Sequence, residues 1–168
     1  MKHSILNKIY RVIWNCVYIF FFRFTPIPLF FWRSFILRLF CAKIGGRCHI
    51  YPKCRIWAPY NLVCGDYSCI ANDVEVYNQG KIVIGKNVVI SQGGYLCSAT
   101  HNYTKKEFPL VIKKIFVEDN VWIAAKAFIH PGVRIGTNAI VSACSVVKKD
   151  VPPNVIVEGF PAKVVKKR

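Results

Sequence analysis

Large aliphatic side chains recur at every sixth position through the second half of the chain. This run consists entirely of β-branched residues: Val117, Ile123, Ile129, Ile135, Val141 and Val147. Four residues after each of them stands a small or medium-sized side chain: Val121, Ala127, Val133, Ala139, Ser145 and Val151. Two shorter runs with the same spacing come earlier: Ile84, Ile90 and Leu96, and before them Ile44, Ile50, Ile56 and Leu62, with Cys48 and Cys54 in the second position.

A period of six matches neither an α-helix nor the alternation of a single strand. It is typical of a coil of short parallel strands and turns, with three hexads per turn and the aliphatic residues pointing into a narrow prism. Stacked turns of this kind bury a continuous aliphatic column. We therefore predict an all-β solenoid over residues 44–168. Glycines follow the aliphatic residue at Gly45, Gly85 and Gly136, and we expect them to mark corners with unusual backbone angles.

The period is interrupted twice. It slips between Leu62 and Ile84, and it fails between Leu96 and Val117, where the segment NYTKKEFPLVIKKIF (102–116) leaves the column. Insertions in a solenoid form loops on one side of the coil, which is often the functional side. His101 stands at the root of the second loop and is therefore a candidate functional residue.

Residues 1–43 form an aromatic, basic segment, called the arm below. The uncharged run from Val12 to Phe22 is too short to cross a bilayer on its own. The stretch 25–28, Thr-Pro-Ile-Pro, predicts a helix break. Beyond it, apolar residues recur at helical spacing: Phe31, Phe35, Leu39 and Ala42.

Two interpretations of the arm remain open. Aromatic helices carrying Lys and Arg suit a membrane interface, where the rings lie among the headgroups and the cations meet anionic lipid. Alternatively, the arm packs against the coil or a neighbouring subunit. A secretory signal peptide is disfavoured, because no small-residue cleavage site follows the apolar run.

The composition fits one domain with a strongly basic surface. The chain has 168 residues, of which 54% are hydrophobic and 19% charged, and its formal net charge is +16. Such a charge attracts nucleic acid, anionic lipid or phosphorylated small molecules, and charge alone does not choose among them. No nucleic-acid recognition module is visible in the sequence, so we expect no nucleic-acid partner.

The eight cysteines do not form a recognisable framework. They include no C-x-x-C pair and no histidine at zinc-finger distance. We interpret them as reduced packing thiols of a cytosolic protein.

Several short motifs follow one another in a fixed order. They are Gly65-Asp66-Tyr67-Ser68, Ile90-Ser91-Gln92, Thr100-His101-Asn102-Tyr103, Val121-Trp122-Ile123-Ala124-Ala125, Pro131-Gly132-Val133 and Gly159-Phe160-Pro161-Ala162-Lys163. With them, residues 44–166 resemble the hexapeptide-repeat acyltransferases, most closely the colanic-acid-type and sugar O-acetyltransferases. The resemblance implies homotrimers of left-handed parallel β-helices with active sites between subunits. It also implies transfer of an acetyl group from acetyl-CoA to a sugar hydroxyl, without a metal.

The resemblance also assigns residues to roles. His101 matches the family's catalytic base, and a base with an ordinary pKa near ~6.5 suits the deprotonation of a hydroxyl. Asn72, Trp122 and Asn102 fall on the acceptor side. Many relatives carry Asp where this chain has Asn102, so either a backbone carbonyl or another carboxylate could orient His101. The donor would contact a strip of small and basic residues: Ala125, Ala143, Lys148, Lys149, Lys163 and Lys166.

A carbonic anhydrase and a non-enzymatic coil are alternatives to an acetyltransferase. A γ-type carbonic anhydrase shares the coil but needs three imidazoles around zinc, and the histidines available are His3, His49, His101 and His130. A non-enzymatic binding or structural coil would leave the histidine loop and the basic tail unexplained. We therefore expect a cytoplasmic O-acetyltransferase of surface-polysaccharide biosynthesis that acts by direct transfer. If the membrane interpretation of the arm holds, the enzyme would lie at the inner face of the membrane and its acceptor sugar would be carried on lipid.

Overall fold

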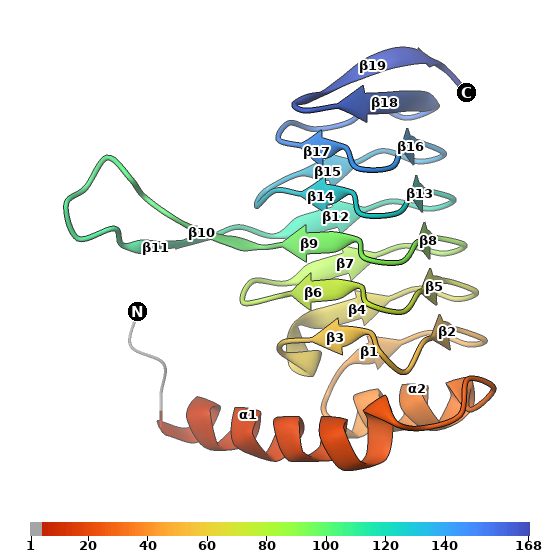
Figure 1. The fold of residues 1–168 in the computed structure, drawn as a ribbon, viewed down its shortest axis with the longest axis vertical. Coiled ribbons are helices and arrows are strands. Elements are labelled where there is room, and N and C mark those ends of the chain that lie inside the picture. The colour runs from red at the N-terminus through yellow and green to blue at the C-terminus, as the bar shows by residue number, and fades with distance from the viewer. Residues whose placement is uncertain (1–4) are drawn as a thin grey trace.

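The computed structural model describes residues 5–168, and its body is a left-handed parallel β-helix (Figure 1). Three sheets form the sides of a prism, and their strands are parallel except for β19, which runs antiparallel to β18 at the end of sheet B. Sheet A contains β1 (Lys43–Ile44), β4 (Leu62–Cys64), β7 (Ile82–Ile84), β12 (Ile115–Val117) and β15 (Arg134–Ile135). Sheet B contains β2 (His49–Ile50), β5 (Cys69–Ile70), β8 (Val89–Ile90), β13 (Trp122–Ile123), β16 (Ile140–Val141), β18 (Val155–Gly159) and β19 (Ala162–Lys167). Sheet C contains β3 (Arg55–Ile56), β6 (Glu75–Tyr77), β9 (Tyr95–Cys97), β14 (Phe128–Ile129) and β17 (Val146–Val147).

The six-residue pattern is confirmed as the inward column of the coil. Every aliphatic residue of the long run from Val117 to Val147 is at most 2% exposed. Its second positions, from Val121 to Val151, are buried as well, as are Cys48 and Cys54. Because these side chains stack from one coil to the next, the prism has a continuous aliphatic centre. Thr100, four residues after Leu96 and thus also at a second position of the repeat, is instead exposed, because it lies in the inserted hairpin.

The slip in the period comes from coils that are longer at one corner. Ile44 pairs with Cys64, and Cys64 pairs with Ile84, so each of these coils is two residues longer than three hexads. In the first coil the extra residues lie beside the 3₁₀-helix η2 (Pro59–Asn61), between sheets C and A. The pattern placed Leu62 in the column of Ile56. Leu62 is indeed buried, but it pairs with Ile82, and Cys64 takes the registered position.

The prediction about the three glycines was wrong. Gly45, Gly85 and Gly136 do not have positive φ; that backbone conformation falls two residues later at Arg47, Asn87 and Asn138. Their requirement is space, because a Cβ on Gly45 would lie 2.6 Å from the Asp66 nitrogen of the next coil, and one on Gly136 would lie 2.6 Å from the Pro153 nitrogen. Glycine is needed here because stacked backbones approach closely at this corner.

The inserted segment is an antiparallel hairpin that leaves the coil between sheets C and A (Figure 1). Its strands are β10 (Ala99–His101) and β11 (Leu110–Ile112), with His101 paired to Leu110. The coil resumes at Ile115, which is buried and pairs with Ile82. The last residues of the segment 102–116 therefore belong to sheet A, contrary to the sequence prediction.

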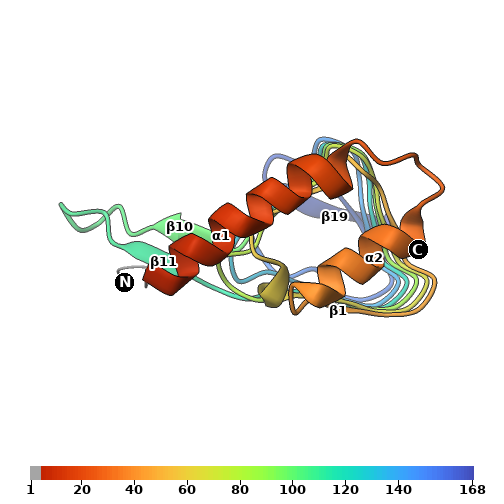
Figure 2. The same cartoon turned by 90° about the horizontal axis from the view of Figure 1, so that it is seen from below.

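The arm folds into helices that lie across the N-terminal end of the coil (Figure 2). They are α1 (Ile5–Val17), the π-helical turn η1 (Tyr18–Arg23) that continues it, and α2 (Phe30–Leu39). The break predicted at residues 25–28 is confirmed. Beneath the coil the helices bury Trp14, Phe22, Ile36 and Leu37. The packing interpretation of the arm is therefore correct for this inner face.

Arm side chains also satisfy the open end of the coil. Strands β1, β2 and β3 lie at the edges of their sheets, so carbonyls at their ends need partners from outside the coil. Each finds a donor on the arm: Arg38 Nε at 3.0 Å from the Ile44 oxygen, Arg33 Nε at 2.5 Å from the Ile50 oxygen, and Trp14 Nε1 at 2.7 Å from the Ile56 oxygen. The arm therefore acts as a cap that makes polar contacts on every side of the prism.

The helix predicted from the spacing of Phe31, Phe35, Leu39 and Ala42 is confirmed as α2, although Ala42 lies beyond its end and is buried. Phe31, Phe35 and Leu39 are exposed, and the face of α2 toward the coil is formed by Arg33, Ser34, Ile36 and Leu37. One expectation about the arm needs correction. The apolar run is part of a longer continuous helix, Ile5–Arg23, which by length and composition alone could cross a membrane. A signal sequence or a buried core helix meets the same criterion, so this finding by itself is weak evidence for a membrane span.

Candidate active site

His101 is held by the hairpin in one defined orientation. Its Nδ1 lies 2.5 Å from the backbone oxygen of Phe108, on the returning side of the hairpin. A carbonyl oxygen only accepts hydrogen bonds, so Nδ1 carries the hydrogen and donates it. In the neutral ring Nε2 then presents a lone pair. The sequence allowed either a backbone carbonyl or a carboxylate to orient His101, and in the structure the group is the backbone carbonyl of Phe108.

Asn102 stabilises the loop beside this histidine. Its side-chain oxygen accepts hydrogen bonds from the Thr104 backbone nitrogen at 3.0 Å and from the Thr104 hydroxyl at 2.7 Å. This is the local turn that Asn forms with the residue two positions ahead. The amide oxygen is therefore engaged within the loop, and the amide nitrogen is the group that could donate a hydrogen bond to an acceptor substrate.

A shallow groove of about 460 Å³ runs along the corner between sheets B and C. Its lining is mostly small or aliphatic: Ser91, Gln92, Trp122, Ala124, Ala125, Ile140, Ser142 and Ala143. Trp122 forms one wall, with its indole nitrogen 3.0 Å from the Ser91 hydroxyl oxygen. Ser91 and Gln92 stand in one of the family motifs, where the sequence assigned them no role, and Ser142 was not singled out. The recurrence of these residues at one corner of the repeat could have identified them as groove residues.

The structure separates the residues predicted to bind the donor. Ala125 and Ala143 line the groove on neighbouring coils. Lys163 and Lys166 lie on β19, which extends sheet B beyond β16 and β18 at the C-terminal end of the coil. Lys148 and Lys149 follow β17 in sheet C and do not line the groove; the Lys148 ammonium lies 4.9 Å from the centre of the Phe160 ring. Trp122, predicted on the acceptor side, instead shares the groove with the two alanines.

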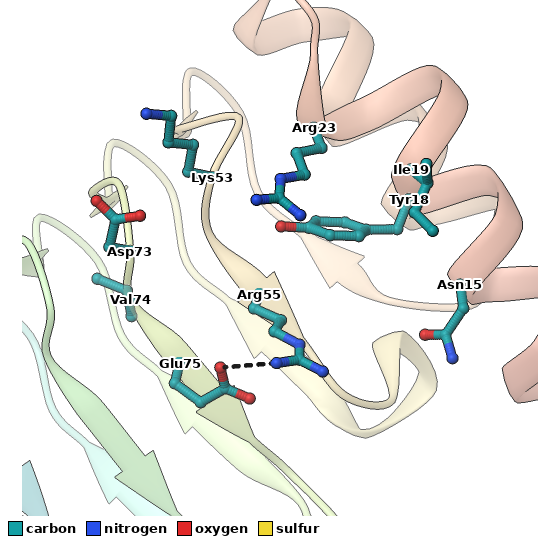
Figure 3. A pocket seen from close by; sticks show the side chains of 9 residues that line it. All are labelled: Asn15, Tyr18, Ile19, Arg23, Lys53, Arg55, Asp73, Val74 and Glu75. Carbon is teal, nitrogen blue, oxygen red and sulfur yellow. Dashed lines mark ion pairs between the residues drawn. The ribbon is translucent and has the colours of Figure 1, made fainter.

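A second cavity of about 500 Å³ lies between the arm and the first two coils (Figure 3). It is called the cleft below. The arm contributes Asn15, Tyr18, Ile19 and Arg23, and the coils contribute Lys53, Arg55, Asp73, Val74 and Glu75. Partial burial raises the pKa of the Glu75 carboxyl, and nearby Arg55, 4.0 Å away, acts in the opposite direction. The cleft therefore offers both donors and acceptors of hydrogen bonds. No sequence pattern predicted this cleft, because its walls come from separate elements.

Asn72 stands at the edge of the cleft, at the same corner as the groove. It precedes the cleft residue Asp73, and its side-chain oxygen accepts a hydrogen bond from the Lys53 backbone nitrogen at 3.2 Å. Along the B–C corner, the cleft, Asn72 and the groove with Ala125 and Ala143 therefore follow one another on successive coils.

His101 is not brought to this corner within one chain. The hairpin leaves between sheets C and A, whereas the groove lies between sheets B and C (Figures 1 and 2). In a three-sided prism these are different corners. A single chain therefore carries the base and the groove on separate surfaces.

The other histidines occupy separate places. His49 stacks on the Phe30 ring with 4.5 Å between ring centres. His130 follows β14, and burial, together with the nearby Lys148 ammonium, lowers the pKa of its ring. His3 lies outside the described residues. Within residues 5–168, no three His, Cys, Asp or Glu side chains are grouped so that they could hold a metal ion.

Comparison with known proteins gives consistent results. Residues 114–149 match the family model described as bacterial transferase hexapeptide (six repeats). The WcaF protein of Escherichia coli, named as an acetyltransferase of colanic acid biosynthesis, is 40% identical over 96% of this chain and 89% of its own length. The galactoside O-acetyltransferase of Lactococcus lactis is 33% identical over 80% of this chain and 60% of its own. Among solved structures, a hexapeptide-repeat acetyltransferase of Vibrio cholerae in complex with acetyl-CoA superposes with a TM-score of 0.89 at 25% identity, covering 99% of this chain and 91% of that one.

Proposed function

Because the chain belongs to the hexapeptide-repeat acyltransferase family, we propose that it transfers an acetyl group from acetyl-CoA to a sugar hydroxyl in surface-polysaccharide biosynthesis. The observation that carries this proposal is the His101 ring, whose Nδ1 is fixed on the Phe108 carbonyl while Nε2 is left as a base. The relatives named for galactoside acetylation and colanic acid biosynthesis support the sugar as acceptor.

The reaction follows from the position of one proton. His101 Nε2 removes the proton from the acceptor hydroxyl as that oxygen attacks the thioester carbonyl carbon. The C–S bond then breaks, and the ring returns the proton to the departing sulfur, so His101 ends in its starting form. The Phe108 carbonyl keeps the protonated ring in place, because Nδ1–H remains its donor throughout. Direct transfer needs no covalent enzyme intermediate.

The groove suits the donor. Its alanines and serines leave room for an extended chain lying along the corner, and the Trp122 ring offers one flat wall. Lys163 and Lys166 continue the same sheet toward the C-terminal end, where their ammonium groups suit phosphates. Lys148 and Lys149 would have to reach the donor from the sheet C side.

In this proposal the acceptor sugar binds in the cleft. Asn72 at its edge would donate from its amide nitrogen, since the amide oxygen is engaged with Lys53. The charged and amide side chains of the cleft match the hydroxyl groups of a sugar. An acceptor lying there would present a hydroxyl toward the groove one or two coils above.

A homotrimer would unite the base with the groove. Because the two lie at different corners of one prism, a second copy must supply the hairpin that faces each groove. Symmetric association of identical chains provides this arrangement for every subunit. All eight cysteines are free thiols, which supports a cytoplasmic location. Peripheral contact of arm residues 5–43 with the inner membrane face would bring a lipid-linked acceptor to the enzyme.

The first test is calorimetric titration of acetyl-CoA and CoA into the wild-type protein and His101→Ala. We expect equal donor binding in both, and an acetylation rate on sugar acceptors that falls by about 10²–10⁴-fold in the variant, as for loss of a general base. Absence of donor binding by the folded wild-type protein would refute the proposal.

Mixing two inactive variants tests the shared site. One variant, His101→Ala, lacks the base but keeps its groove. The other, Ala125→Phe, keeps the base but has its own groove filled. If each site takes its hairpin and groove from different chains, co-expressed variants regain activity in about a quarter of their sites. Activity that stays at the level of the single variants would show that one chain supplies both parts.

A further inference from the structure

The arm has a second face, turned away from the coil, that is broadly apolar. Exposed side chains on this outer face include Ile9, Val12, Phe20, Phe24, Phe31 and Leu39. Phe24 and Phe31 are 77% and 80% exposed. Seen from below, α1 and α2 lie across the end of the coil, and no other helix or strand of residues 5–168 covers them (Figure 2). A concentration of exposed large apolar side chains on two helices is typical of a binding surface.

The charge around this face has one sign. No Asp or Glu occurs before Asp66. Lys8, Arg23, Lys43 and Arg47 are exposed among or beside the apolar residues. Basic residues beside large aromatic and aliphatic groups match an anionic bilayer, whose surface attracts each cation and whose interior accepts the rings.

A second copy of the chain is a poorer occupant. Two outer faces packed against each other would bring basic residues together with no carboxylate from either arm to neutralise them. Like charges held close together in a partly dehydrated interface repel. The same absence of acidic residues that opposes self-association favours a negatively charged surface.

The helix Ile5–Arg23 cannot span the membrane while it caps the coil. Its inner face holds Trp14 and Phe22 in the core, and the Trp14 indole donates to the Ile56 oxygen at 2.7 Å. Turning the helix across a bilayer would expose these side chains and leave that carbonyl unpaired. The geometry is that of a helix lying in the plane of the interface.

We propose that the outer face of the arm lies on an anionic lipid bilayer, with the axis of the coil standing upright from it. In a trimer with parallel axes, three such faces would share one plane and add their binding energies. The wall of the cleft includes Arg23 from the arm (Figure 3), and in this orientation the cleft would open close to the membrane surface. Resting on the proposed function, this position selects acceptor sugars carried on lipid over free sugars.

The test is co-sedimentation of the full-length protein with vesicles, in the absence of acetyl-CoA. Vesicles of phosphatidylcholine alone are compared with vesicles that also contain phosphatidylglycerol. We expect binding to the anionic vesicles that weakens as salt screens the charges. High salt should release the protein, since it is peripheral. Retention through an alkaline carbonate wash would show a spanning helix and overturn the proposal.

Paired substitutions locate the binding face. Phe24→Ser with Phe31→Ser should weaken binding to anionic vesicles by at least ~10-fold, because each ring loses an apolar environment. The matched control, Tyr103→Ser with Phe160→Ser, removes two exposed rings outside the arm, 84% and 74% exposed, and should bind as the wild type does. Equal binding by both double variants would overturn the proposal.

Two further readouts separate the remaining outcomes. If the outer face joins two trimers, the Phe24 and Phe31 variant will halve the molar mass in light scattering while no form binds vesicles, and this would overturn the proposal. Acetyl-CoA titration of the same variants should match the wild type. Loss of vesicle binding with donor binding retained supports the docking surface, whereas failure of donor binding in every form refutes the enzymatic function and leaves the docking result standing.

Discussion

The buried guanidinium of Arg33 is expected to hold the arm on the coil. Its side chain is fully buried, and its donors reach four oxygens on two segments: Ile50 O at 2.5 Å, Thr25 Oγ1 at 2.8 Å, Pro26 O at 2.9 Å and Ile27 O at 2.5 Å. Methionine has a similar length and no donor. Arg33→Met therefore removes all four hydrogen bonds while keeping most of the packing.

The size of the effect follows from the groups left behind. Unpaired buried carbonyls cost about 1–3 kcal/mol each, and disrupting a buried charge network costs about 3–5 kcal/mol. Burial lowers the pKa of Arg33, which shows that dehydrating the cation offsets part of what its hydrogen bonds contribute. Carbonyls at the edge of the arm can also recover water. We therefore expect a loss of about 3 kcal/mol in the free energy of unfolding.

Urea unfolding with two probes measures this loss. Trp14 is the one fully buried tryptophan of the four in the chain, so its fluorescence reports the arm, while far-ultraviolet circular dichroism reports the coil. In Arg33→Met the fluorescence transition should move to lower urea and precede the loss of strand signal. The control Arg38→Met loses contacts to Ile44 and Gly45 at the exposed edge, and it should cost about 1 kcal/mol. An Arg33→Met transition within about 0.5 kcal/mol of the wild type would refute the capping role.

Two other substitutions test the stacking of the coil. Gly65→Ala should lower the free energy of unfolding by about 2–4 kcal/mol, because the new Cβ would lie 2.6 Å from the Gly85 backbone. The control Gly46→Ala should change the melting temperature little, because the nearest atom to its Cβ would be 3.8 Å away. Glu118, whose pKa is held below its usual value by Arg134 and a neighbouring threonine, should contribute about 0.5–1 kcal/mol at neutral pH. Since its folded pKa is depressed, that contribution is lost as pH falls through the acidic range, so the stability difference between wild type and Glu118→Gln should vanish there and persist at pH 7. A difference that does not change with pH would contradict the assignment.

The sequence determined the coil and the position of its insertion. A six-residue period of β-branched residues can be satisfied only when each points into a shared column, so burial from Val117 to Val147 could be read directly from the spacing. The place where the period fails identified the hairpin and put His101 at its root. These features depend on neighbours along the chain, and a linear pattern records them.

Tertiary structure alone decided what contacts what across the coils. The Phe108 carbonyl could not be identified as the partner of His101, because a backbone oxygen is present at every residue. The inner face of α2 was hidden as well, since it is built around Arg33 rather than an apolar stripe. The need for glycine at Gly45 came from the approach of the next coil and not from its own φ. In each case the deciding energy comes from groups distant in sequence, whose meeting is set by how the coils stack and how the arm closes their end.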